Sequence, residues 1–313
     1  MLQWYIDISQ YNCPTMLDYH YISTKERLFL STVGIPLKRF HKLAWRFSQR
    51  CKSFRFNRPQ IRSAGGGRKP ERFGSDEELL FYLLFYVRIY PTFDLAQAVF
   101  ELDRANLCRW LHTYLPVLER TLLYKIALPA KQTNTLAELF KKVPALAEHI
   151  VDATEQRMNR PKYNQEPYYS GKKKCHTRKR QIICTGKGKL LGVSSAVPGS
   201  VHDKRLEEQT MYLNHAPPGA KRLGDRAYQG ESDTYGIWGI RTMVPKKKPK
   251  GGELTSAEKE VNRQISSLRV IVEHVIGHLK YSRIFGDKTR YRRDISDPIS
   301  NVVGGLYNFK HGY

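Results

Sequence analysis

The chain has 313 residues, of which 41% are hydrophobic, so it can bury a sizeable core and is not a disordered protein. It carries 53 Lys and Arg against 29 Asp and Glu, a formal net charge of +24, and a folded protein this basic is typical of nucleic-acid binders. No apolar run reaches the roughly 20 residues of a membrane-spanning helix. A basic protein that binds membrane surfaces is therefore the weaker alternative.

The cysteines and the first residues predict the compartment. The five cysteines are odd in number and include no CxxC pair, which indicates a reducing compartment rather than a disulfide framework. Cys175, His176 and Cys184 lie close in sequence, but the spacing and the fourth ligand of a zinc site are missing. The opening MLQWYIDISQ lacks the basic start and apolar stretch of a signal peptide. We therefore expect an intracellular protein.

Residues 1–54 are expected to form an N-terminal helical segment, because residues 22–50 carry apolar side chains at helical spacing. Residues 55–74 contain three consecutive glycines and many basic residues, which predicts a flexible linker. From residue 36 to residue 70 there are eleven Lys and Arg and no acid. The linker could follow a phosphate backbone or could simply be a solvated loop.

Residues 75–147 are predicted to form a helix-turn-helix domain. Ser75 is a candidate N-cap with Glu78 at the capping-box position, and Pro91 ends this first helix. A short helix follows over residues 92–100, and Asp103 is the candidate N-cap of a third that runs to about residue 123. A purely structural bundle would give the same pattern. In a helix-turn-helix, the exposed start of the third helix would read DNA through Arg104, Asn106, Arg109 and His112.

Residues 148–313 change to a pattern of strands and turns. Strands are expected at residues 149–154, 179–185, 190–197, 220–223 and 240–244, with a helix at 202–212 between the third and fourth. A long helix is expected from residue 256 to about residue 281. This order is that of a ribonuclease-H-like core, a mixed five-stranded sheet with flanking helices. The fold class is therefore α+β or α/β, preceded by the all-α helix-turn-helix domain.

Three acids lie where that core would place metal ligands. Asp152 lies in the first strand among apolar neighbours, Asp225 ends the fourth strand, and Glu273 lies in the long helix. Singly, each has an ordinary explanation, as a turn residue, a helix cap or a surface partner of Arg269. Phosphodiester cleavage by a pair of Mg²⁺ ions requires carboxylates that converge from different elements. Their joint placement therefore favours a metal site.

Five segments, in order, resemble the transposases of the insertion-sequence-five group and their Harbinger-like relatives, which have an Asp-Asp-Glu active site. Arg269, Glu273 and Lys280 match that group's spacing, whereas Ser266 stands where the group often has Tyr. This departure concerns a supporting contact and not a metal ligand. The resemblance implies that Asp152, Asp225 and Glu273 bind two Mg²⁺ ions, with Mn²⁺ as a substitute. The matching segments are VDATE (151–155), YYSGKKKCHTRKRQ (168–181), VPGSVHDKR (197–205), GDRAYQG (224–230) and RVIVEHVIGHLK (269–280).

Further residues are candidates for support of the site or for contact with DNA. Arg269 and Lys280 would position the phosphate or Glu273. His202 and Asp203 lie in the first turn of the helix predicted at residues 202–212, and Asp203 is either a cap or rigidifying contact or a rival metal ligand. The candidate DNA contacts form basic clusters that flank the three acids and comprise Lys172, Lys173, Lys174, Arg178, Lys179, Lys246, Lys247 and Lys248, with another cluster at Arg290, Arg292 and Arg293.

The function expected from these features is that of a transposase. It would bind the terminal inverted repeats of an insertion sequence as double-stranded DNA, cleave there and transfer the strand into target DNA. The two-ended reaction implies a homodimer or larger assembly, in the cytoplasm and associated with the nucleoid. Two alternatives stay open: a related metal-dependent endonuclease without strand transfer, and a domesticated sequence-specific DNA-binding protein.

Overall fold

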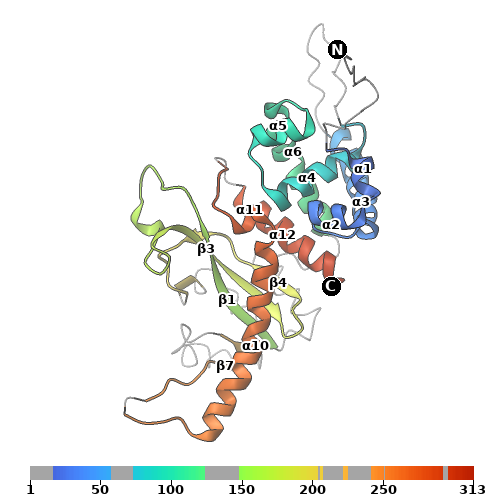
Figure 1. Ribbon diagram of the computed structural model, residues 1–313. Coiled ribbons are helices and arrows are strands. Elements are labelled where there is room, and N and C mark those ends of the chain that lie inside the picture. The colour runs from blue at the N-terminus through green and yellow to red at the C-terminus, as the bar shows by residue number, and fades with distance from the viewer. Residues whose placement is uncertain are drawn as a thin grey trace, which may run out of the picture.

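The computed structural model describes residues 17–57, 73–123, 148–203, 205–206, 221–224, 241–249, 251–291 and 295–313. The chain forms a helical part, residues 17–123, and a second part in which long helices pack on a sheet (Figure 1). The predicted mixed α+β class is confirmed. None of the described helices is long and apolar enough to cross a membrane.

The helical part forms because its helices bury one face each against α4. Helix α3 buries Phe40, Leu43 and Phe47, three residues at helical spacing, and it packs on α4 and α6. Helix α4 is buried almost all round, as expected for the central helix of a bundle. The six helices are α1 (Tyr19–Ser23), α2 (Glu26–Val33), α3 (Leu37–Phe56), α4 (Asp76–Ile89), α5 (Phe93–Phe100) and α6 (Arg104–Leu123).

The three helix starts predicted in this part are confirmed. The Ser75 side chain accepts a hydrogen bond from the Glu78 N–H, and the Thr92 and Asp103 side chains cap α5 and α6 in the same way. The Glu78 carboxylate accepts from the Gly74 N–H and not from that of Ser75, so the capping box is one residue wider than predicted. Helix α4 ends at Ile89, just before Pro91, as expected.

The sheet has the strand order β2-β3-β1-β6-β7, with β4 and β5 also paired to β3. Strand β3 is antiparallel to β1, β4 and β5, whereas β6 is parallel to both β1 and β7. The sheet is therefore mixed, as predicted. Its strands are β1 (Glu148–Arg157), β2 (Tyr169–Ser170), β3 (Cys175–Thr185), β4 (Leu190–Val193), β5 (Val197–Pro198), β6 (Lys221–Leu223) and β7 (Arg241–Met243).

The strand predicted at residues 190–197 is interrupted in the structure. Residues 190–197 form β4, then a break, then the start of β5. The break arises because the Ser195 hydroxyl and the Ala196 N–H both donate to the Asp297 carboxylate, at 2.8 and 3.4 Å, instead of continuing the ladder. The predicted helix at residues 202–212 lies mostly outside the described residues, although the Leu206 N–H donates to the His202 carbonyl as in a first helical turn.

Three C-terminal helices complete the fold: α10 (Ser256–Lys280), α11 (Arg283–Gly286) and α12 (Ser296–His311). Helix α10 begins with a capping box between Thr255 and Glu258 and packs on β1, β3 and β6, so the long predicted helix is confirmed. Helix α12, which the sequence analysis does not predict, packs on α6 and β4. Gly304 permits that approach, because a Cβ there would lie 2.7 Å from a Leu190 methyl carbon.

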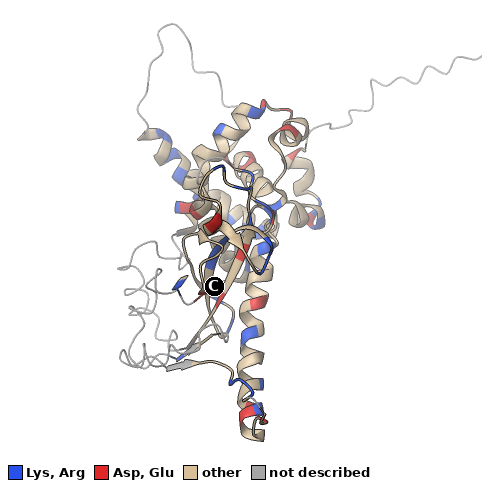
Figure 2. Cartoon of the chain, turned by 90° about the vertical axis from the view of Figure 1, so that its left-hand side faces the viewer, with Lys and Arg blue, Asp and Glu red and all other residues tan. Residues whose placement is uncertain are grey.

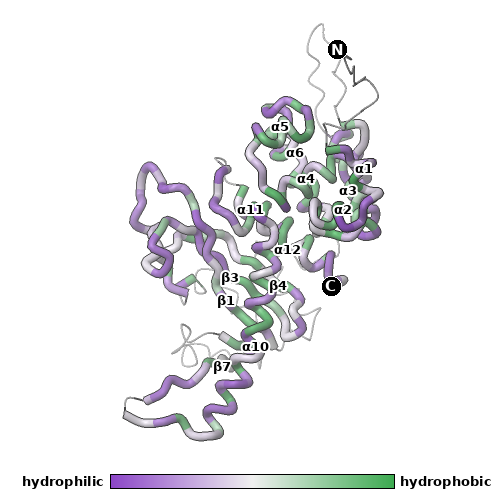
Figure 3. The backbone as a smooth tube through the Cα atoms, in the orientation of Figure 1, coloured by the Kyte–Doolittle hydropathy of each residue, from purple (hydrophilic) through white to green (hydrophobic). Residues whose placement is uncertain are grey.

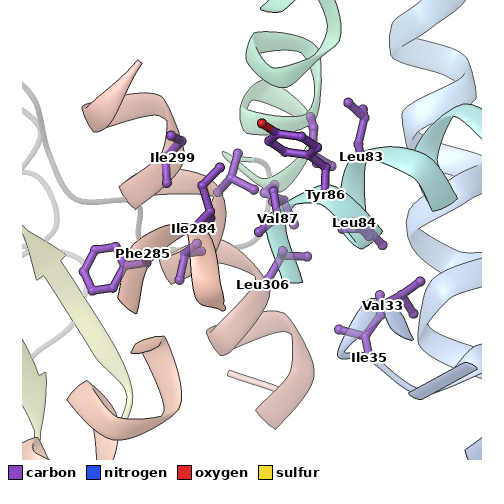
Figure 4. Packing of buried hydrophobic residues seen from close by; sticks show 14 of the residues in the cluster. Val33, Ile35, Leu83, Leu84, Tyr86, Val87, Ile284, Phe285, Ile299 and Leu306 are labelled. Atoms are coloured by element: carbon purple, nitrogen blue, oxygen red, sulfur yellow. The ribbon is translucent and has the colours of Figure 1, made fainter. Parts of the chain in front are cut away.

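The two parts share one hydrophobic core. Val33, Leu84 and Val87 of the helical part lie close to Ile284 and Leu306 of the C-terminal helices (Figure 4). Hydrophobic segments gather where α4, α12 and the sheet meet, whereas the far end of α10 and the loop before it are hydrophilic (Figure 3). The candidate site therefore lies on a sheet that is fixed against the helical part.

Candidate active site on the sheet and helix α10

Asp152 lies on β1 and faces helix α10. It pairs with Ile182 of β3, so both side chains project from the same face of the sheet. Ile182 belongs to the core shared with α10, and Asp152 itself is half-buried there. Its Oδ1 accepts a hydrogen bond of 2.8 Å from the Ala153 N–H. Burial and the nearby charge of Asp152 raise the pKa of the Cys184 thiol to about 12, which shows that this carboxylate lies against the core.

The register between β1 and β6 relates Asp152 to the second candidate acid. Strand β6 runs parallel to β1, and Ile150 lies opposite Leu223. Asp152 follows Ile150 by two residues in the sequence, and Asp225 follows Leu223 by two residues. Asp225 lies outside the described residues.

Glu273 lies on α10, the helix that packs on β1 and β6. Its side chain is 56% exposed, and its Oε1 lies 3.8 Å from Nη2 of Arg269, one helical turn earlier. Arg269 is the more buried partner, with a side chain 21% exposed. The predicted pairing of these two residues is thus present, and the Arg269 guanidinium lies on one side of the Glu273 carboxylate.

Lys280, seven residues after Glu273, reaches the environment of Asp152. Partial burial of its ammonium and the charge of Lys173 lower the pKa of Lys280, whereas Asp152 and Glu155 act in the opposite direction. The charges of Lys173 and of Asp152 therefore both act on this side chain. Among the described residues, no group of three or more His, Cys, Asp or Glu lies close enough to hold a metal ion.

Lys280→Met should make the folded protein slightly more stable near neutral pH and should slow DNA cleavage. The folded pKa of Lys280 lies below 10.5, so its charge disfavours folding at pH values below that pKa. The difference in stability should shrink as the pH rises through the lowered pKa. Thermal unfolding over a pH series and the cleavage rate measure both effects.

Lys310→Met is the matched control for this prediction. Burial and the charge of Arg88 also lower the pKa of Lys310, but this residue lies at the end of α12, away from the sheet. The Lys310→Met substitution should therefore stabilise the protein without slowing DNA cleavage. Equal cleavage by the Lys280→Met and wild-type proteins would contradict a role for Lys280 in the site.

The opposite face of β1 and β3 carries a buried ionic network that the sequence analysis does not identify. The Thr177 hydroxyl donates to Glu155 at 2.8 Å, and Nζ of Lys179 lies 4.0 Å from the same carboxylate. Nζ of Lys179 also donates to Asp203 at 2.9 Å and to the Val201 carbonyl at 2.6 Å. The network ties the turn at residues 199–203 to the sheet. Side chains alternate between the two faces of a strand, so the spacing in VDATE already indicated that Glu155 points to the face opposite Asp152.

One predicted functional residue, Lys179, is therefore placed differently from the expectation. Lys179 was expected to contact DNA, but its side chain is only 10% exposed and is already bound to Asp203. Asp203 was weighed as a rival metal ligand, and its ion pair with Lys179 instead matches the rigidifying contact considered beside it. His202 is exposed. The physical reason is that β3 is covered on this face by the turn, which the local sequence does not indicate.

The other predicted DNA contacts lie at or near the surface. Lys172, Lys173 and Lys174 are exposed in the turn between β2 and β3, and Arg178 follows half-buried on β3. Lys246, Lys247 and Lys248 are exposed in the loop before α10, where Lys246 pairs with Glu258 at 2.8 Å. In the α5–α6 hairpin, Arg104 pairs with Asp94 at 2.8 Å and Arg109 donates to Asn106 at 2.7 Å. Arg290 lies against Tyr90, whereas Arg292 and Arg293 lie outside the described residues.

Comparisons with known proteins identify the family of this chain. Residues 151–308 match the family model described as DDE superfamily endonuclease. A protein of Microchaete diplosiphon described as a probable transposase for insertion sequence element IS702 is 31% identical over 253 residues, which cover 78% of this chain and 83% of that protein. No solved structure matches. With half of the chain covered by the family model and most of it aligned to a transposase, the chain belongs to the DDE superfamily endonucleases.

Proposed function

We propose that this protein is the transposase of an insertion sequence, built on a ribonuclease-H-like core. It would bind the terminal inverted repeats of its element, cleave the DNA there and join the freed 3′ end to target DNA. The similarity to a protein described as a probable insertion-sequence transposase supports this proposal. The strand order β4-β3-β1-β6-β7, with β6 and β7 parallel to β1, supports the fold.

The observation that carries the proposal is the convergence of three elements. Parallel strands β1 and β6 lead toward Asp152 and Asp225 in the same direction and at the same register. Helix α10 packs across both strands and carries Glu273. Carboxylates from two neighbouring strands and one covering helix are a suitable arrangement for metal-assisted phosphodiester chemistry.

The donor set suits Mg²⁺. Asp152 and Glu273 offer carboxylate oxygens, which are the ligands that this ion prefers, and Asp152 is a strand acid among apolar neighbours, where an uncompensated charge is costly. We assign Asp152, Asp225 and Glu273 as ligands of two Mg²⁺ ions, with Mn²⁺ as a substitute. When bound, the ions would activate the oxygen nucleophile and stabilise the charge that develops on the leaving oxygen.

The remaining residues would orient the site and hold the DNA. Arg269 would fix the Glu273 carboxylate, and Lys280 would place a positive charge beside the scissile phosphate. The turn anchored by Lys179 would hold His202 and Asp203 in position behind β1. Lys172–Lys174 and Lys246–Lys248 would follow the backbone of the DNA, and the α5–α6 hairpin would read the end repeats through Arg104, Asn106 and Arg109. Two ends processed together would require a dimer or larger assembly in the nucleoid.

The proposal is tested with Glu273→Gln and with its matched control Glu260→Gln. Both acids lie on α10 and both pair with an arginine, Glu260 with Arg263 at 2.9 Å. Each protein is incubated with the end DNA of its element, Mg²⁺ and a plasmid target. The wild-type and Glu260→Gln proteins should cut and join, and Glu273→Gln should do neither while binding the end DNA as well as wild type.

Other outcomes of the same experiment favour the alternatives. Cutting without joined product would identify a metal-dependent endonuclease. Binding of end DNA with neither reaction in the wild-type protein would identify a DNA-binding protein and contradict the enzymatic proposal.

A further inference from the structure

Helix α3 has an unusual charge content. It contains seven Lys and Arg and no acid over its 20 residues. Of the described helices with eight or more residues, it alone contains no acidic residue. The neighbouring helix α4, by contrast, begins with three acids. The charge of α3 is therefore a local feature and not merely a share of the overall +24.

Three of the seven basic residues of α3 lie on a continuous exposed stripe together with two aromatic residues. Residues at alternating separations of four and three lie on one face of a helix. The stripe extends for about 27 Å at the usual helical rise. Its two aromatic side chains are unusually open, with Trp45 67% and Phe56 90% exposed. The stripe consists of Lys38, Lys42, Trp45, Gln49, Lys52 and Phe56, all of which are exposed.

The charges of this surface lack acidic partners. Two arginines of α3 are engaged within the fold: Arg39 donates to the Phe309 carbonyl, and Arg55 pairs with Asp76 at 2.7 Å. The other five Lys and Arg of the helix form no ion pair with any acid in the described part of the chain.

Helix α10 provides the contrast within the same molecule. It carries both acids and bases along its length (Figure 2), and pairs such as Arg263–Glu260 and Arg269–Glu273 neutralise one another. A merely solvated basic protein surface would resemble α10. The positive charge of α3, which no acid of the described residues offsets by an ion pair, instead attracts polyanions such as a phosphate backbone.

We infer that the exposed stripe of α3 is a second DNA-binding surface, which binds double-stranded DNA apart from the α5–α6 hairpin. An α-helix fits the major groove, where lysines reach phosphates on either side. Trp45 and Phe56 supply apolar contact with sugars and base edges. Four further Lys and Arg, and no acid, follow the helix in the sequence between residues 57 and 70. This inference shares its partner with the proposed function but does not depend on the three acids.

The position of α3 separates its DNA from that of the hairpin. Helix α3 packs on α4 and α6, whereas α5 packs on α6, and α3 and α5 lie apart from each other (Figure 1). One duplex segment at each surface would give the protein either a long footprint that bends around the helical part or contact with two duplexes. In either arrangement, α3 contributes affinity for DNA that remains when the contacts of the α5–α6 hairpin are removed.

The experiment measures binding to the full chain of a duplex of arbitrary sequence and about 30 base pairs, roughly three helical turns. The test protein is Lys38→Gln/Lys42→Gln/Lys52→Gln, and the control is Lys25→Gln/Lys187→Gln/Lys259→Gln, which removes the same charge from exposed lysines elsewhere. The stripe variant should bind about 100-fold more weakly in 0.1 M salt, and its plot of log affinity against log salt should be shallower by about 2.7. The control should lose less than threefold. Thermal unfolding establishes that both variants fold.

Trp45 supplies an independent readout. Duplex DNA should quench tryptophan emission of the wild-type protein, and Trp45→Phe should remove most of that change. Equal losses in both triple variants, or unchanged affinity in the stripe variant, would overturn the inference. The inference would also be overturned if the stripe variant lost binding to phosphatidylglycerol vesicles but kept its binding to DNA. DNA binding through the stripe by a protein that never cleaves would sink the proposed function and leave this inference standing.

Discussion

Asp152→Asn is expected to lower metal-dependent DNA cleavage by at least about 10³-fold, because loss of one carboxylate ligand removes several kcal/mol of charge stabilisation in the transition state. The substitution preserves the size of the side chain and its hydrogen bond from the Ala153 N–H, so the fold should be retained. Cleavage of end DNA with Mg²⁺ and with Mn²⁺ measures the effect, and duplex binding measured in parallel should be nearly unchanged.

Asp287→Asn is the control for this experiment. Asp287 is half-exposed, pairs with Arg283 at 3.2 Å and lies after α11, so its loss should leave cleavage within about twofold of wild type. Retained cleavage in the Asp152→Asn protein would remove Asp152 from the site. The same cleavage assay with Asp225→Asn tests the acid that lies outside the described residues. Full cleavage activity of this variant would refute the assignment of Asp225 as a metal ligand.

Lys179→Met should destabilise the folded protein by about 3 kcal/mol, because it removes the positive partner of two acids and leaves a buried carboxylate uncompensated. The Glu155 side chain is 10% exposed and would retain the hydrogen bond from the Thr177 hydroxyl. We expect the melting temperature to fall by about 5 °C and the salt dependence of DNA binding to stay unchanged. Denaturant unfolding and duplex binding over a salt series measure the two quantities.

A double-mutant cycle with Glu155→Gln isolates the cause. If the uncompensated carboxylate produces the loss, Lys179→Met/Glu155→Gln should be less destabilised than the sum of the single variants. Lys172→Met, an exposed lysine in the neighbouring turn, should show the reverse pattern, with weaker DNA binding and unchanged stability. If Lys179→Met instead keeps its stability and loses about one unit of salt slope, the original prediction of a phosphate contact is restored.

The order of strands and helices along the chain could be predicted because the signals of most of these elements are local in the sequence. The alternation around Asp152, the apolar stripe of α10 and the caps at Ser75 and Asp103 all depend on residues within about one turn or one strand of each other. The two candidate acids within the described residues were found in this way, and their elements are packed together as expected. Helix α12 was missed, and the strand at residues 190–197 was drawn too long, because contacts with Asp297 and Leu190 come from residues about 100 positions away.

The sequence by itself determined most of the secondary structure, the basic character of the chain and the candidate acids, because these follow from local propensity and composition. Only the tertiary structure decided which charged side chains face water. Lys179 and Lys42 are both lysines in basic segments, yet one is buried beneath a turn and bound to Asp203, and the other lies exposed on α3. That difference depends on which distant element covers each face, and the free energy of an ionised group depends on that cover.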